Sequence, residues 1–304
     1  MKKRILAAVL AALFILSLAG CEIKPQPDRT DTSKEPAESS APSGEPAETD
    51  VADAELLLSF LNGDTEAVVY DDFYESLIYE VDDSLVGAES LSFQELAQLM
   101  GSVVDVDEGN WEISYALMET MGGREMLVVR YQGLPGRDGG CYFIFGVYGQ
   151  EVRLTHTENF WSRSRSELYQ NLIFIGDGSG GVGDHFDWCG YIDDEGDYRL
   201  VYNVETLYST YVAMYAYPLF DIMDTDWAEA CECRVMTTEE GKFYELHAGA
   251  GTDPEKLALL RDYLAQQGMT EIDSVEEAMD QAKEANGVED TAVFEDWIPW
   301  EAEG

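Results

Sequence analysis

Histidine and cysteine are the side chains of this 304-residue sequence best suited to bind a metal ion. His185 and Cys189, taken with Cys231 and Cys233, would supply four ligands of the kind that zinc accepts. Their spacing matches no standard zinc motif, because structural sites usually begin from two CxxC-like pairs. Whether the protein binds a metal is therefore left open, and no cofactor is predicted.

Cysteine pairing has more than one solution. Cys231 and Cys233 are two residues apart in an expected strand, so their side chains should point to the same side and pair poorly with each other. Buried free thiols are one interpretation. The other interpretation is a single disulfide that joins Cys141 or Cys189 to Cys231 or Cys233.

The glycine-rich segment 176–183 contains Ser179 and is the most unusual stretch of the chain. It lacks the lysine of a phosphate-binding loop, and Asp177 stands where a G-x-S-x-G elbow needs glycine. A flexible connector is one interpretation, and a loop that holds a ligand with its backbone N–H groups is the other. A Ser–His–acid arrangement stays open on residue counts, but no spacing supports it.

The acidic segment Asp193–Asp197 has a central glycine and invites comparison with a calcium loop. Aligning Gly196 with the EF-hand glycine places Tyr191 and Tyr202 at the first and last ligand positions, so the EF-hand fails. We expect an acidic hairpin turn here. A looser calcium site is left open, either in this turn or at Asp177, Asp184 and Asp187.

Arginines are concentrated in residues 124–165, whereas residues 51–123 contain neither Lys nor Arg. These arginines could pair with the acidic surface of the same domain or form a recessed site for an anion. Aromatic residues that could bind sugars or peptides, or simply fill the core, include Trp161 and Trp188. The predicted ligand-binding residues are Trp161, Arg163, Arg165 and Ser179.

The first twenty residues have the pattern of an export signal, with basic residues at 2–4 and an apolar stretch at 5–16. This stretch ends in Leu18-Ala19-Gly20-Cys21, which resembles the lipobox of bacterial lipoproteins. The resemblance implies cleavage before Cys21 and lipid on its thiol. We expect acyl chains on Cys21 to hold the protein at a cell membrane, on the extracytoplasmic face.

Four regions follow from composition. Residues 1–20 are the signal peptide, and residues 21–50 are the lipidated cysteine with a Pro/Ser-rich, acidic tether. As a coil this tether would span about 30 Å. Residues 51–286 should form the folded domain, and residues 287–304 an acidic tail that is either loose or docked through Trp297 and Trp300.

The pattern of the folded region predicts an α+β class with a dominant antiparallel, curved sheet, either a meander, barrel-like or a partial propeller. Short helices should precede the sheet, one of them with the capping box Ser92–Glu95. Two helices should follow it, with the capping boxes Thr252–Glu255 and Ser274–Glu277. Strands are expected near 111–118, 125–132, 141–148, 151–156, 168–175, 187–192, 198–206, 211–217, 230–237 and 242–247. Hairpin turns are expected at 131–133, 148–150 and 193–197.

The chain resembles uncharacterised surface lipoproteins of Gram-positive anaerobic bacteria. The resemblance rests on the lipobox, the tether, the helix end Phe60-Leu61-Asn62-Gly63, the strand Cys141–Phe145 and the Gly-Ser-Gly-Gly segment around Ser179. It implies no known activity and no transferable site.

The net charge of the chain disfavours a nucleic-acid-binding function. The chain has 18 basic and 61 acidic residues, a net charge of −43, which repels nucleic acid. We expect a non-enzymatic binding or cell-envelope interaction module, anchored in the membrane through Cys21, with an envelope polymer, peptide or protein as partner. The alternative is a secreted hydrolase that acts on a cell-wall or carbohydrate substrate.

Overall fold

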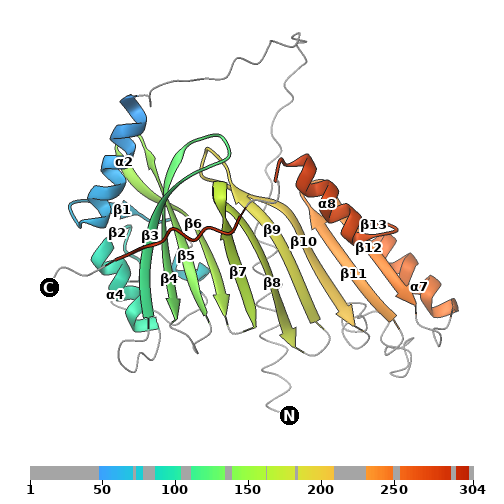
Figure 1. Cartoon of the computed structure of the whole chain (residues 1–304). Coiled ribbons are helices and arrows are strands. Elements are labelled where there is room, and N and C mark those ends of the chain that lie inside the picture. Colours follow the sequence, from blue (N-terminus) through green and yellow to red (C-terminus); the bar gives the residue numbers. More distant parts are fainter. Residues whose placement is uncertain are drawn as a thin grey trace, which may run out of the picture. The chain divides into compact units, whose positions relative to one another are not determined.

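Two sheets of seven strands each form the folded part of the protein, together with helices (Figure 1). The computed structural model describes residues 48–70, 73–77, 86–103, 111–133, 139–161, 163–181, 184–208, 231–248, 254–288 and 292–300. All of these belong to one unit, Pro46–Gly304. The signal peptide and most of the tether lie outside the described residues.

The first sheet is built around an antiparallel meander. Its strands are β3 (Trp111–Glu119), β4 (Glu125–Gly133), β5 (Gly139–Tyr148) and β6 (Glu151–Trp161). The short β1 (Glu66–Val68) lies parallel to β6 and pairs with β2 (Ser90–Ser92). At the other edge, β14 (Ile298–Pro299) pairs with β3, so both ends of the described chain join this sheet.

The second sheet is a longer meander that starts directly after the first. Its strands are β7 (Ser164–Tyr169), β8 (Ile173–Gly181), β9 (Asp184–Ile192), β10 (Tyr198–Tyr208), β11 (Cys231–Thr238) and β12 (Gly241–Ala248), with β13 (Met269–Glu271) parallel to β12. The α+β class with antiparallel-rich sheets is therefore confirmed. In the described part of the chain neither sheet closes into a barrel or a propeller.

Helices cover one face of the first sheet. These are α2 (Glu48–Leu61), the short α3 (Phe73–Ser76) and α4 (Phe93–Val103). Phe60 of α2 packs against Phe145 of β5, and both are fully buried in one core cluster. The capping box before α4 is confirmed, since Ser92 N–H donates to Glu95 at 2.8 Å and Glu95 N–H donates to Ser92 Oγ at 3.2 Å.

The second sheet carries one helix on each face. On one side, α7 (Pro254–Gln266) packs over Cys233 and Tyr244. On the other, α8 (Val275–Ala285) packs over Met236 and Val204. The opposite faces follow from the alternation of side chains along β11 and β12. Among the described residues no helix is long and apolar enough to cross a membrane.

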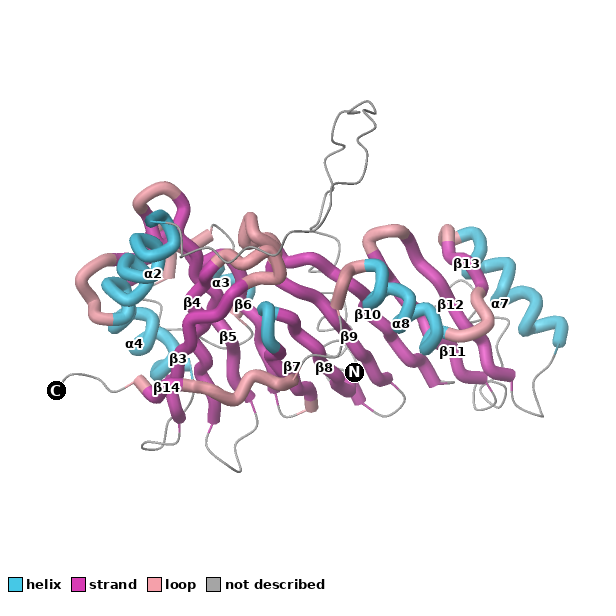
Figure 2. Tube along the Cα trace, turned by 45° about the horizontal axis from the view of Figure 1, so that its top comes forward, coloured by secondary structure: helices cyan, strands magenta, loops and turns pink. Residues whose placement is uncertain are grey.

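The C-terminal segment 292–300 lies docked across both sheets (Figure 2). Phe294 N–H donates to Leu168 O of β7 at 2.9 Å, and Trp300 N–H donates to Ile113 O of β3 at 2.9 Å. Trp297 stacks on Tyr142 of β5 at a centroid distance of 5.9 Å. Of the two alternatives for the tail, loose or docked through Trp297 and Trp300, the docked one is therefore correct for residues 292–300.

Three sequence expectations are wrong in detail. The stretch 168–175 is not one strand, because residues 170–172 form a turn between β7 and β8 and Asn171 has φ 61°. Residues 176–181 are not a loop but the second half of β8, and residues 131–133 are not a turn but the end of β4. The strand expected at 211–217 lies outside the described residues.

Candidate functional site

Polar and aromatic side chains meet where β6 of the first sheet faces β9 and β10 of the second. His156 and Glu158 alternate with Thr157 along β6, so both point toward the second sheet. Trp188 of β9 and Tyr198 of β10 face them. Ser166 of β7 lies on the same face of the second sheet as Trp188, because it pairs in register with Gly176, which pairs with Trp188. We call His156, Glu158, Ser166, Trp188 and Tyr198 the inter-sheet site.

Glu158 is the central polar group of this site. Its Oε1 accepts a hydrogen bond from Trp188 Nε1 at 2.9 Å, and its Oε2 lies 3.4 Å from His156 Nε2. The side chains of His156 and Glu158 are only 19% and 13% exposed. A carboxylate in so sheltered a position makes strong, directional hydrogen bonds.

Tyr198 and Ser166 contribute hydroxyl groups. The Tyr198 ring stacks on His156 at 4.7 Å with an interplanar angle of 12°. Burial raises the pKa of Tyr198, and the charge of Glu158 raises it further, so its hydroxyl stays protonated. Ser166 is only 5% exposed, and its Oγ has no hydrogen-bond partner among the described residues. Orphaned buried hydroxyls of this kind indicate an unfilled bonding position.

Glycines of β8 and β9 make room for the rings. A Cβ on Gly176 would lie within 3.0 Å of three atoms of the Trp188 indole. One on Gly178 would meet the Phe186 ring equally closely, and Gly190 stands in the same relation to Tyr198. The rings therefore lie over glycines that present no side chain, and Phe186 and Trp188 stack on each other at 5.6 Å. Neither a flexible connector nor a backbone cradle describes residues 176–181.

A separate cavity of about 200 Å³ has Thr155 and Asp197, the sequence neighbours of His156 and Tyr198, in its lining. It is lined by residues of the β5–β6 hairpin and of the turn between β9 and β10, namely Tyr148, Arg153, Leu154, Thr155, Glu195, Gly196 and Asp197. Tyr148 Oη spans the two sheets by donating to Glu195 O at 2.5 Å. The cavity thus has one wall from each sheet.

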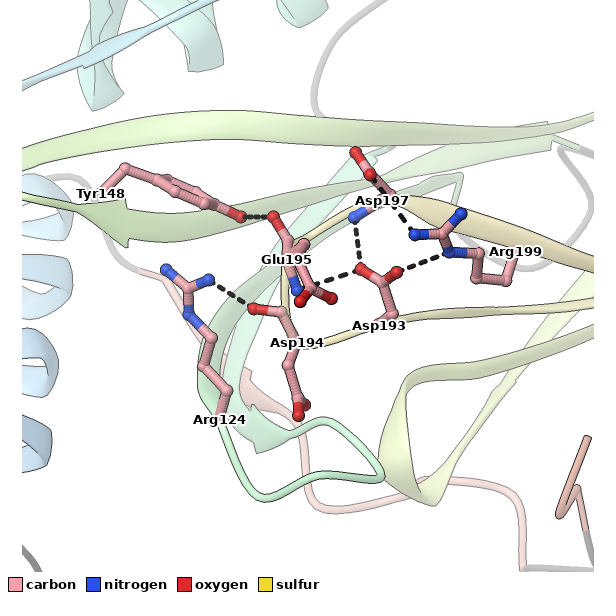
Figure 3. Close-up of polar contacts among 7 residues, drawn as sticks. All are labelled: Arg124, Tyr148, Asp193, Asp194, Glu195, Asp197 and Arg199. Carbon is pink, nitrogen blue, oxygen red and sulfur yellow. Dashed lines mark hydrogen bonds and ion pairs between the residues drawn. The ribbon is translucent and has the colours of Figure 1, made fainter. Parts of the chain in front are cut away.

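The acidic turn Asp193–Asp197 is confirmed as a hairpin turn, and the carboxylates of Asp193, Asp194 and Asp197 have protein partners (Figure 3). Asp193 accepts from the N–H groups of Glu195 and Asp197 and pairs with Arg199 at 2.5 Å. Asp194 accepts from Thr120, and its carbonyl accepts from Arg124 at 2.5 Å. These bonds fix the turn against the first sheet, which accounts for the acidic cluster without calcium.

Two of the four candidate zinc ligands, Cys189 and Cys233, lie on opposite faces of the second sheet, and the side chain of Cys231 is outside what the structure describes. Cys189 lies in the core under α8, and Cys233 lies in the core under α7, on the opposite face. Cys141 and Cys189 are buried free thiols, and burial raises the pKa of Cys189 to about 11. No group of three or more His, Cys, Asp or Glu side chains in the described residues converges as a metal site would require. The zinc hypothesis is therefore wrong for these residues.

The predicted binding residues lie near one another at the β6–β7 connection. Ser179 N–H donates to Arg163 O at 2.7 Å, and Arg165 follows on β7. Trp161 is the last residue of β6, and its side chain is outside what the structure describes. The Arg165 side chain is 70% exposed and pairs with Asp177 at 2.5 Å. This is an exposed ion pair rather than a recessed anion site.

Ser179 has a histidine as its neighbour on the next strand. Ser179 and His185 are register partners in the β8–β9 hairpin, and Asp177 and Asp187 are the next pair on the same face. Burial raises the pKa of Asp187, and the charge of Asp177 raises it further. This face of β8 and β9 is the one opposite to the inter-sheet site.

Sequence reasoning singled out Trp188 but missed the other four residues of the inter-sheet site. One signal was available: His156, Glu158 and Phe160 alternate with period 2, which marks one face of a strand. A second signal was the alternation of Gly176 and Gly178 with larger residues, which is typical of a strand with one face formed by glycines. No protein-family model matches the chain, and no match was found among curated proteins or among solved structures.

Proposed function

We propose that the protein is a lipid-anchored lipoprotein of the extracytoplasmic membrane face whose folded part binds a ligand without transforming it. The anchor rests on the Leu18-Ala19-Gly20-Cys21 pattern after an apolar stretch. The tether then separates the folded part from the membrane surface by about 30 Å. An envelope polymer, a peptide or a protein is within reach of such a module.

One observation carries the binding role, namely the meeting of the polar and aromatic side chains of the inter-sheet site. Aromatic rings, a sheltered carboxylate and two hydroxyls converge between the sheets. Ligand sites generally combine apolar walls with a few well-placed polar groups. Glu158 is held by Trp188 and His156 in fixed geometry, which suits recognition.

Fractionation of cells tests the anchor. The full chain should sediment with membranes and be digested by protease added to intact cells, whereas Cys21→Ser should appear in the soluble fraction. Cys21→Ala is the matched second variant, since it also lacks the thiol. Membrane attachment of both variants would refute lipid anchoring at this residue.

Thermal shift measurements on the purified full chain test the binding role. A ligand at a hundred times its Kd stabilises the folded state by about 2.7 kcal/mol. A hit among sugars, peptides and nucleotides should be recovered unchanged after overnight incubation, and Glu158→Ala should abolish the shift. Chemical conversion of the ligand would overturn the non-enzymatic role.

The hydrolase alternative has its own support in the register pairs Ser179–His185 and Asp177–Asp187. A serine beside a histidine, with carboxylates two residues further along, contains the residue types of acyl-transfer catalysis. If this alternative holds, the full chain should hydrolyse an ester or cell-wall substrate and Ser179→Ala should remove that activity. Hydrolysis unaffected by Ser179→Ala and Asp187→Asn would exclude this face.

A further inference from the structure

We infer that the inter-sheet site binds an uncharged oligosaccharide, with a sugar ring placed against Trp188 and its hydroxyls bonded to Glu158, Ser166 and Tyr198. This inference rests on the proposed binding function and names its ligand class.

The aromatic surface has the form that a sugar ring needs. A pyranose presents a C–H face, which packs on a flat ring, and hydroxyls at its rim. Trp188 and Phe186 are stacked with an interplanar angle of 26° and are each partly exposed. Because Gly176 and Gly178 lie behind these rings, the rings lie close to the sheet and form a shallow platform.

The polar groups around the platform match the hydroxyl groups of a sugar. Glu158 retains acceptor capacity beyond its bonds to Trp188 and His156, because a carboxylate accepts about four hydrogen bonds. Ser166 Oγ and Tyr198 Oη can each donate and accept a hydrogen bond, and Ser166 Oγ has no hydrogen-bond partner among the described residues. Three groups of this kind within one site favour a ligand rich in hydroxyls over an apolar one.

Peptide recognition by strand addition is disfavoured at the platform. The platform rings project from β9, which pairs with β8 on one side and β10 on the other. The backbone groups of β9 are therefore used within the sheet, and a ligand must be recognised by side chains.

Charge disfavours an anionic ligand. The chain carries a net charge of −43, which includes Glu158 in the site and Glu195 and Asp197 at the cavity. Arg153 also lines the cavity, but it pairs with Glu151 at 2.7 Å. An uncharged sugar avoids this repulsion, whereas uronic-acid or phosphate polymers do not.

Titration of the full chain with uncharged tetrasaccharides tests the inference, using calorimetry and Trp fluorescence. The probes are tetramers of N-acetylglucosamine, β-linked glucose and α-linked mannose, with a galacturonic acid tetramer and an uncharged hexapeptide for comparison. At least one uncharged tetramer should bind. Glu158→Ala should weaken that binding by about tenfold or more, since it removes a charged acceptor. Tyr191→Phe is the matched control, because Tyr191 lies on β9 but faces the α8 side.

Each outcome decides between the inference and the proposed function. Binding of an uncharged tetramer that Glu158→Ala weakens and Tyr191→Phe leaves unchanged supports the inference. Preference for the galacturonic acid tetramer, or binding of the hexapeptide alone, overturns the ligand class and leaves the binding function standing. If Glu158→Ala and Tyr191→Phe bind the tetramer equally well, the ligand does not bind at the inter-sheet site. If no probe binds, and the thermal shift screen described above also finds no ligand, both statements fall. If Glu158→Ala fails to fold, Gly176→Ala is the second variant, and it should weaken binding of the same tetrasaccharide.

Discussion

Replacing Gly176 by alanine tests whether the glycines of β8 exist to receive the aromatic rings. The backbone of Gly176 does not require glycine, because its φ is not in the left-handed region. The added Cβ would nevertheless lie within 3.0 Å of three indole atoms of Trp188, so the ring must move. Displacing it breaks the 2.9 Å bond from Nε1 to Glu158.

The magnitude follows from two costs. Overpacking costs about 1–3 kcal/mol, and loss of a hydrogen bond to a charged group costs about 1.5–3 kcal/mol. Together these costs give about 2.5–6 kcal/mol. Because Trp188 is partly exposed and can relax outward, we expect a loss of stability in the lower half of this summed range, about 3 kcal/mol. For a domain of this size, that lowers the melting temperature by about 6–12 °C.

A double-mutant cycle with Trp188→Ala isolates the ring as the cause. In the Trp188→Ala background the same Gly176→Ala change should cost less than about 0.5 kcal/mol, or stabilise slightly by restricting the unfolded chain. Urea unfolding followed by far-ultraviolet circular dichroism measures all four corners. An equal cost of Gly176→Ala in both backgrounds, or none in the wild type, would refute the role assigned to this glycine.

Three further outcomes are expected. Trp297→Ala should lower the free energy of unfolding by about 1–3 kcal/mol, because the ring stacks on Tyr142 but is partly exposed; an unchanged urea midpoint would contradict the docking of the C-terminal segment. Burial raises the pKa of Tyr131 and Tyr142 to about 12, above the value of about 10 in the unfolded chain, so the unfolded state loses these protons first as pH rises. Their contribution to stability is complete below pH 10 and should fall by about 1.4 kcal/mol per tyrosine per pH unit between about pH 10 and 12. Phenolate absorbance at 295 nm with a native midpoint near 10 for every tyrosine would contradict this. Cys141, a fully buried thiol whose pKa burial raises well above its usual value, should resist iodoacetamide at pH 8 until denaturant is added; mass spectrometry showing rapid native labelling would contradict its burial.

Local patterns in the sequence were sufficient for the elements with strong signals. The capping boxes at Ser92 and Ser274 mark the starts of α4 and α8, because a side-chain acceptor there satisfies an otherwise unpaired N–H group. The hairpin at Gly149 was predicted for a similar reason, since its φ of 71° favours glycine. These features depend only on residues within one turn of each other.

Features that depend on distant partners were not predictable. Residues 176–181 look like a loop because glycine lowers strand propensity, yet the rings of Phe186 and Trp188 from the next strand cover them. The turn at 170–172 was missed because Asn171 and Leu172 carry no glycine or proline signal despite their positive φ values. Glu158 acquires its role only when β9 brings Trp188 to it, 30 residues away in the chain.

The partners of the arginines in residues 124–165 bear on the charge of the ligand. Arg124 bonds to Asp194 O and Val147 O, Arg153 pairs with Glu151, and Arg165 pairs with Asp177. Arg124 therefore joins two hairpin ends through backbone carbonyls, and Arg153 and Arg165 pair with carboxylates of their own domain, as the first of the two sequence interpretations holds for them. Because they are used in this way, these three arginines are not positioned to bind an anion beside Glu158. An anion placed there would be repelled by the Glu158 carboxylate, whereas a ligand that presents only hydroxyls can donate hydrogen bonds to it.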